Sequence, residues 1–127
     1  MASELRVNTL KDAAGNNSVG MEYVANGSAK AWNSFDGTVS SNYVLDSFNS
    51  SSFTDNGTGS YIFAFTSSMS NDDYASPAGY GETETADHGI RWPHRNTHNT
   101  TSQTRGLSNN GNGNVGRIHV TILGDLA

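Results

Sequence analysis

The stretch SSFTDNGTGSYIFAF, residues 51–65, predicts a β-hairpin. Its turn is expected at residues 55–57, Asp-Asn-Gly, followed by Gly59. Asn and Asp tolerate a positive φ and glycine adopts it freely, so this run suits a tight reversal of the chain. Residues 60–66 then return as the antiparallel partner of the strand that contains Phe53.

The returning strand is apolar on both faces. Side chains alternate along a strand, so Tyr61, Phe63 and Phe65 share one face, while Ile62 and Ala64 share the other. Such a strand is typical of a sandwich core or a subunit interface, where both sides are covered.

Apolar partners for these rings are scarce in the rest of the chain. Leu, Ile, Val and Phe supply only 22 of 127 residues, whereas Ser, Thr, Asn and Gly supply 58. Charged residues are also few, and the apolar ones cluster in strand-like runs, which argues against a disordered chain. We therefore expect copies of the chain to complete the core, and we assign an intersubunit core to Phe53, Tyr61, Phe63 and Phe65.

Shorter patterns predict strands on either side of the hairpin. Residues 5–10, LRVNTL, alternate as a short strand, and residues 19–32 read as strand, turn and strand. The five-residue spacing from Phe48 to Phe53 predicts a kink or bulge between them. Residues 115–123, VGRIHVTIL, predict a final strand.

Between residues 70 and 114 hydrophobic residues are scattered among Ser, Thr, Asn and Gly. Ordinary connections are much shorter, and a loop longer than about 15 residues is usually functional or mobile. The pattern predicts one long loop with a binding role.

Aromatic and polar side chains that suit a glycan gather in this loop. Sugar rings stack their C–H faces on Trp or Tyr, and Arg and His bond their hydroxyl groups. The candidate receptor-binding residues are Tyr80, His88, Arg91, Trp92, His94, Arg95 and His98. Alternatively, Trp92 and Ile90 simply anchor the loop to the body.

Catalysis and metal binding are not predicted. The carboxylates of residues 72–73 and 82–87 are loop-borne and close in sequence, whereas a glycosidase holds two acids about 5 to 10 Å apart across a cleft. His94 and His98 would meet only on a helix, and Pro93 in a Gly, Asn and Thr-rich region predicts a loop. We expect no enzyme, cofactor or metal.

Charge and composition argue against two classes of partner. The net charge is −5 without Lys or Arg clusters, so nucleic acid is not an expected partner. No apolar run approaches the ~20 residues that cross a bilayer, so membrane insertion is not expected. Without cysteine, rigidity is expected from β-pairing and assembly.

Three blocks of the sequence resemble a known class of protein. They are SELRVNTLKDAAGNNSVGMEYVANGSAKAW (residues 3–32), DSFNSSSFTDNGTGSYIFAFTSSMSNDDY (46–74) and RIHVTILGD (117–125). In this order they resemble the short tail-fibre and related virion proteins of tailed bacteriophages, particularly those that infect cyanobacteria and other marine bacteria. The resemblance implies a homotrimeric virion component, made in the host cytoplasm and placed on the phage tail or particle surface. It carries over no catalytic residue.

We therefore predict an all-β homotrimer of two parts. Residues 1–32 attach to other tail or baseplate proteins and trimerise, through Leu5, Val7 and Leu10. Residues 33–127 form an antiparallel β-sandwich-like body with a variable loop at about 75–114. Trimer or core packing is assigned to Phe53, Tyr61, Phe63, Phe65, Ile118, Val120 and Ile122.

The predicted function is adsorption to a host-surface glycan without catalysis. The alternative is a purely structural virion component, such as a decoration, baseplate or joint protein, that binds no receptor.

Overall fold

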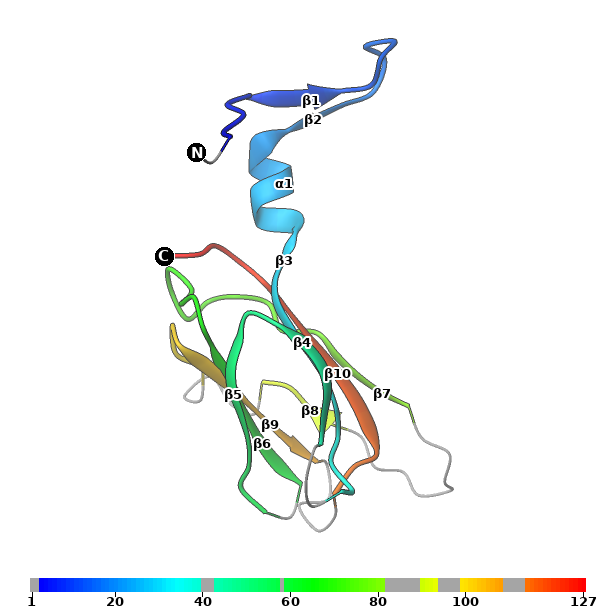
Figure 1. Cartoon of the computed structure of the whole chain (residues 1–127), viewed down its shortest axis with the longest axis vertical. Coiled ribbons are helices and arrows are strands. Elements are labelled where there is room, and N and C mark those ends of the chain that lie inside the picture. The colour runs from blue at the N-terminus through cyan, green and yellow to red at the C-terminus, as the bar shows by residue number, and fades with distance from the viewer. Residues whose placement is uncertain (1–2, 40–42, 58, 82–89, 94–98, 109–113) are drawn as a thin grey trace.

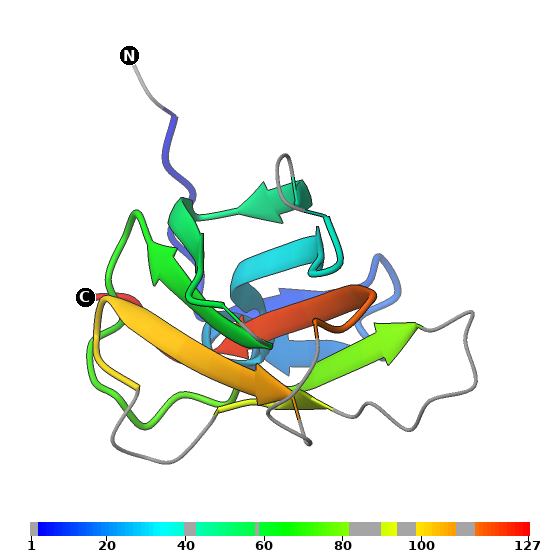
Figure 2. The same ribbon diagram turned by 90° about the horizontal axis from the view of Figure 1, so that it is seen from below.

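The structure, a computed structural model, describes residues 3–39, 43–57, 59–81, 90–93, 99–108 and 114–127. Two antiparallel four-stranded sheets face each other around one core, and an N-terminal arm, residues 3–28, stands away from them (Figure 1 and Figure 2). For these residues the predicted all-β architecture is confirmed.

The two sheets draw their strands from the whole body of the chain. The first has the order β4–β3–β10–β7, with β4 Val44–Phe48, β3 Ala29–Asp36, β10 Arg117–Leu123 and β7 Ala78–Gly81. The second has the order β5–β6–β9–β8, with β5 Ser50–Asp55, β6 Ser60–Phe65, β9 Gln103–Ser108 and β8 Ile90–Arg91. Because β3 begins at Ala29, residues 29–32 belong to a body sheet and not to the arm.

The hairpin of residues 51–65 forms as predicted. β5 pairs with β6 in antiparallel register, with Phe53 opposite Phe63. The turn contains Gly57 at φ +82° and Gly59 at φ +71°, the left-handed conformations that glycine adopts without strain. The Asp55 carboxylate accepts the Gly57 N–H at 2.8 Å, which closes the turn.

The predicted kink lies at Asn49, where the chain leaves the first sheet for the second. Asn49 has φ +53°, a conformation that asparagine tolerates better than most residues. Its side-chain amide donates to the Lys30 and Ser67 carbonyls, both at 3.0 Å, and its Oδ1 accepts the Ser67 N–H at 2.6 Å. These bonds hold both ends of the crossing in place.

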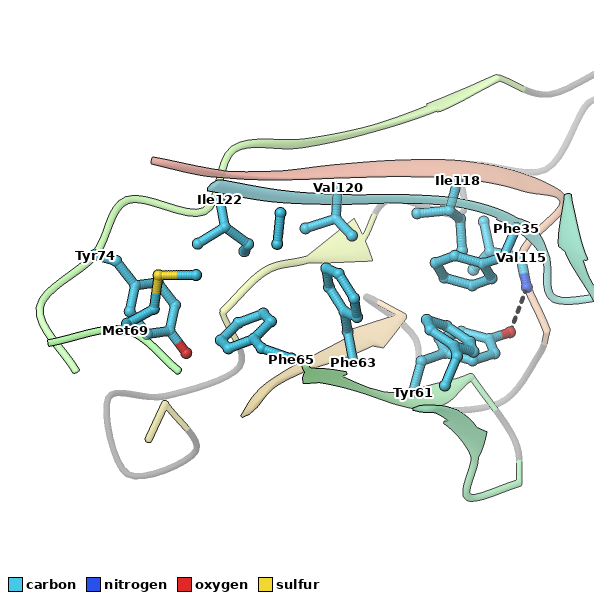
Figure 3. Packing of buried hydrophobic residues seen from close by; sticks show 12 residues of the cluster. Phe35, Tyr61, Phe63, Phe65, Met69, Tyr74, Val115, Ile118, Val120 and Ile122 are labelled. Carbon is cyan, nitrogen blue, oxygen red and sulfur yellow. Dashed lines mark hydrogen bonds between the residues drawn. The ribbon is translucent and has the colours of Figure 1, made fainter. Parts of the chain in front are cut away.

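The aromatic rings of β5 and β6 pack inside a single chain. Tyr61, Phe63 and Phe65 face the aliphatic side chains of β10, and Phe35 of β3 lies 4.2 Å from Phe53 between ring centroids (Figure 3). The buried cluster also includes Ala31, Met69, Tyr74, Val115, Ile118, Val120 and Ile122. The expectation that one copy cannot supply partners for these rings is wrong, because the opposite sheet supplies them.

The expectation of a single long loop at about 75–114 is also wrong, because the strands β7, β8 and β9 lie within this range. β9 pairs with β6 along its length, and β7 pairs with β10. The sequence did not predict β9, because its inward residues, Thr104 and Gly106, are small or polar. They leave no apolar alternation in the sequence.

The arm contains a two-stranded hairpin, β1 Thr9–Lys11 and β2 Ser18–Gly20, followed by the helix α1 Met21–Gly27. The strand expected at residues 5–10 is therefore shorter and displaced. The second strand expected within residues 19–32 is partly wrong, because a helix occupies Met21–Gly27. Glu22 in its first turn favours the helix electrostatically, and the helix ends at Gly27, where the extended backbone of Ser28 follows.

Tyr74 closes the core at the end near the arm. Its ring is buried against Phe65, and its hydroxyl donates toward the Gln103 carbonyl at 2.8 Å and the Thr100 carbonyl at 3.1 Å. Burial raises the pKa of Tyr74 to about 12 from a usual value near 10, because the phenolate would lose its hydration.

This pKa predicts an alkaline loss of stability. The folded state holds the Tyr74 proton more tightly than the unfolded chain, so stability is unaffected below about pH 10 and falls between about pH 10 and 12. The expected loss is on the order of 2 kcal/mol. Urea unfolding of the unmodified chain and of Tyr74→Phe, repeated at several pH values between about pH 7 and 12, measures this loss of unfolding free energy. The phenylalanine variant should lose about 1 kcal/mol at pH 7 and show a shallower alkaline decline; parallel curves would contradict the assignment.

Candidate functional site

The arm exposes an unusual amount of apolar side chain. Among residues 3–28 none is buried. The exposed fractions are 81% for Leu5, 36% for Val7, 42% for Leu10, 37% for Val19 and 70% for Tyr23. The three predicted attachment residues therefore lie on an accessible surface, together with two that the sequence analysis did not single out.

Internal hydrogen bonds give the arm a defined local shape. In the β1–β2 turn the Asp12 carboxylate accepts from the Asn16 backbone N–H at 2.9 Å and the Asn17 side chain at 2.7 Å. These bonds lower the pKa of Asp12, the Asn17 side chain contributing most. At the end of α1, the Lys30 ammonium donates to the Ala25 carbonyl and to Ser28 Oγ.

Local bonds alone do not make such an arm stable in water. A lone two-stranded hairpin is marginal, and helices shorter than about 12 residues rarely persist without packing. The seven-residue helix also lacks a side-chain N-cap bond at Gly20. A segment of this kind gains stability when another surface covers its exposed apolar residues.

The predicted receptor-binding residues fall into three groups. His88, His94, Arg95 and His98 lie outside the described residues. Tyr80 lies in β7 opposite Ile118, and its side chain is likewise outside the description. Arg91 is exposed in β8, at the edge of the second sheet, and Trp92 follows it.

Trp92 matches the alternative interpretation, that of an anchor. Its indole N–H donates to Thr104 Oγ1 at 3.1 Å, and Thr104 donates to Asn99 Oδ1 at 2.7 Å. The ring lies against Gly106 of β9 and 6.4 Å from the Phe35 ring, measured between centroids. The Trp92 ring is thus partly buried against the body, as the anchor interpretation expects.

A hollow that the sequence did not predict lies among connections between strands. These connections are at the end of the body opposite the arm (Figure 1). The volume of the hollow is about 410 Å³. We call it the distal hollow, lined by Thr38, Val39, Tyr43, Thr54, Asp55 and Asn114. They come from the β3–β4 connection, the β5–β6 hairpin and the residues before β10, so no local motif joins them.

The Tyr61 hydroxyl ties these connections together beneath the hollow. It accepts the Val115 N–H at 3.3 Å, the bond drawn in Figure 3, and lies 3.5 Å from both the Gly37 carbonyl and Asn114 Oδ1. A Cβ on Gly37 would come within 2.1 Å of this hydroxyl, so only glycine permits the approach. Burial raises the pKa of Tyr61, because the phenolate would lose its hydration.

Further bonds hold the lining side chains. Tyr43 donates its hydroxyl to the Phe53 carbonyl at 2.8 Å, and Asn114 Oδ1 accepts the Gly59 N–H at 2.9 Å. Asp36 accepts both the Thr38 hydroxyl at 2.6 Å and its N–H at 2.9 Å. The Thr38 bonds, chiefly that from its hydroxyl, lower the pKa of Asp36. The hollow is thus a preorganised polar surface with one aromatic ring.

Among the described residues, no three His, Asp or Glu side chains gather as metal ligands would. In the same part of the chain, no helix has the length and hydropathy needed to cross a membrane.

Comparison of the chain with protein-family models, with curated proteins and with solved structures finds no match.

Proposed function

We propose that this chain is a non-catalytic, tail-fibre-type component of a bacteriophage particle. It associates as a homotrimer and attaches to neighbouring tail or baseplate proteins through the arm. The body adsorbs to a glycan on the host surface. The observation that carries the proposal is an ordered arm of 26 residues with no buried side chain.

The arm supports the proposal because a projecting segment with exposed apolar side chains is typical of assembly contacts. Five of its apolar side chains are exposed at 36–81%, and its helix and hairpin are both too short to persist alone. Other copies of the arm, and the particle to which they attach, would bury this surface. Single exposed apolar residues are ordinary in monomers, but Leu10 and Val19 are neighbours across β1 and β2, and paired apolar residues on a projecting segment favour an interaction site.

The placement of the arm and the hollow also supports the proposal. The arm leaves one end of the sandwich, and the connections that line the distal hollow lie at the other (Figure 1). A protein that joins a particle at one end and meets a cell at the other needs this separation.

Charging the arm hairpin is expected to dissociate the trimer. Leu10 and Val19 are directly opposed across β1 and β2. Leu10→Lys with Val19→Glu keeps a favourable cross-strand pair but removes the apolar surface. We expect light scattering to give three 13.5 kDa chains for the unmodified protein, and association at least about tenfold weaker for the double variant.

Leu45→Lys is the matched control, because Leu45 is 49% exposed but lies on the body in β4. It should remain trimeric. A monomeric unmodified chain at micromolar concentration would contradict the trimer. If Leu45→Lys weakens the trimer as much as the double variant does, the trimer contact is not specific to the arm and includes the body.

Adsorption is tested with the fluorescently labelled chain on a panel of marine bacteria that includes cyanobacteria. Saturable binding that periodate oxidation of the cell surface removes supports a glycan receptor. A trimer that binds no strain of the panel favours the purely structural particle protein instead.

A further inference from the structure

We infer that the distal hollow binds one neutral hexose unit, with Asp55 and Asn114 bonding neighbouring hydroxyls and Tyr43 meeting the apolar face of the sugar ring. This inference rests on the proposed function and replaces the loop cluster around Trp92 as the site of contact. It assigns a site and a ligand class.

The composition of the hollow matches the two kinds of surface that a sugar presents. Thr38, Thr54 and Asn114 offer hydroxyl and amide groups, while Tyr43 and Val39 offer apolar surface. A hexose has polar hydroxyls at its rim and C–H groups on its faces, and small-ligand sites combine apolar walls with a few placed polar groups. The volume of about 410 Å³ falls within the range of such sites and accommodates one or two sugar rings.

Hydrogen-bonding capacity remains at two of the lining side chains. One Asp55 oxygen is occupied by the Gly57 N–H, and Asn114 uses its Oδ1 on Gly59. Within the described residues, no hydrogen bond occupies the second Asp55 oxygen or the Asn114 amide N–H groups. A carboxylate oxygen accepts from one hydroxyl while an amide N–H donates to the next, which suits a vicinal diol.

Charge selects against acidic sugars. Asp55 is the charged residue among the described lining residues, and the chain carries a net charge of −5. A uronic or sialic acid would place its carboxylate beside Asp55, where like charges repel. The hollow is therefore expected to accept neutral hexoses and reject their carboxylated analogues.

Preorganisation favours binding at this place. Tyr61, Gly37 and the Asp55 turn fix the hollow before a ligand arrives, so little ordering cost accompanies binding. For a single sugar we expect a dissociation constant on the order of 1 mM, strengthened by the three copies of a trimer.

The test is an NMR titration of the full ¹⁵N-labelled chain with the methyl glycosides of glucose, galactose and mannose, and with methyl glucuronide. We expect at least one neutral hexoside to shift the amide signals of Gly57, Gly59 and Asn114, and the glucuronide to bind at least about fivefold more weakly. Asp55→Asn keeps the turn acceptor but removes the charge. It should weaken hexoside binding at least fivefold and reduce the discrimination against the glucuronide.

Two further variants complete the design. Val39→Lys places a long side chain at the wall of the hollow, from a lining position that is 40% exposed, and should abolish the shifts. Asp46→Asn is the matched control, because Asp46 also accepts a backbone N–H, that of Ser47, at 2.8 Å but lies on β4 away from the hollow. It should bind as the unmodified chain does.

The cell-binding assay and the titration together distinguish a failure of the hollow as the sugar site from a failure of the proposed adsorption function. If labelled chain binds cells but no hexoside shifts these amides and Asp55→Asn binds normally, the hollow is not the site and the function stands. If the chain binds no cells, adsorption fails, and the titration still decides the hollow. Equal affinity for the glucuronide overturns the assignment to neutral sugars.

Discussion

Phe63→Ala is expected to lower the free energy of unfolding by about 3 to 5 kcal/mol, which approaches the whole stability of a small domain. The Phe63 side chain is fully buried and meets Phe65 edge to face, with ring centroids 5.1 Å apart. Removing the ring leaves a cavity between two sheets, and their paired strands cannot move together to fill it. Circular dichroism during urea unfolding measures the loss, and we expect a chain that is largely unfolded at 37 °C.

Ile62→Ala is the control, because Ile62 is the neighbour on β6 and points to the opposite, half-buried face. Ile62→Ala is expected to lower the free energy of unfolding by less than half as much as Phe63→Ala does. An equal loss would show that the outer face of β6 is covered in the assembly, as its apolar composition first indicated. A stable Phe63→Ala chain would contradict the intramolecular core.

Gly106→Ala is also expected to have a large effect, lowering the free energy of unfolding by about 3 kcal/mol. A Cβ at this position would lie 1.9 Å from Cε3 and 2.3 Å from Cζ3 of Trp92, much closer than atoms approach. The indole cannot retreat freely, because its N–H is bonded to Thr104 and its ring lies near Phe35. Thermal unfolding of the variant, beside that of Gly79→Ala, measures the cost. An added Cβ at Gly79 meets no atom within 4 Å.

A double-mutant cycle identifies the cause. Trp92→Ala alone should cost about 3 kcal/mol or more, since it removes a large ring from the body. In that background Gly106→Ala should cost less than about 1 kcal/mol, because the clashing ring is absent. Strictly additive losses would mean that Trp92 does not pack on Gly106, and would restore it as a candidate for receptor contact.

Local signals were sufficient for part of the fold. The Asp-Asn-Gly turn, the change of direction between Phe48 and Phe53, and the final strand with Ile118, Val120 and Ile122 inward were all readable from residue type and spacing. Each depends on neighbours in the chain, through φ preference or the period of two, so no distant residue needs to be known.

The same local reasoning failed in the arm and in β9. In the arm, Met21 and Tyr23 fit a period of two, yet the segment is helical, and neither its periodicity nor its weak helix propensity indicates that. In β9, inward Thr104 and Gly106 hide the strand, because the space above Gly106 is filled by Trp92, fourteen positions earlier in the sequence. A strand whose facing side chains come from another segment has no hydrophobic pattern of its own.

Of the candidate sites, one could be proposed from local sequence and the other required the fold. Leu5, Val7 and Leu10 could be singled out from the sequence because an apolar residue in a polar segment is visible locally, and all three are exposed. The distal hollow could not be found, since Tyr43, Asp55 and Asn114 meet only when two sheets align their loops at one end.

Residue types and their spacing were enough to predict a β-structure poor in apolar residues, built around the hairpin of residues 51–65. The packing partners of the hairpin became visible only in three dimensions, because the core joins buried residues from distant segments, twelve of them in the described part of the chain. The convergence of polar groups also became visible only there, because the Tyr61 hydroxyl joins connections more than fifty positions apart. Strand preference acts between neighbours in the chain, whereas core packing and site formation act between neighbours in space.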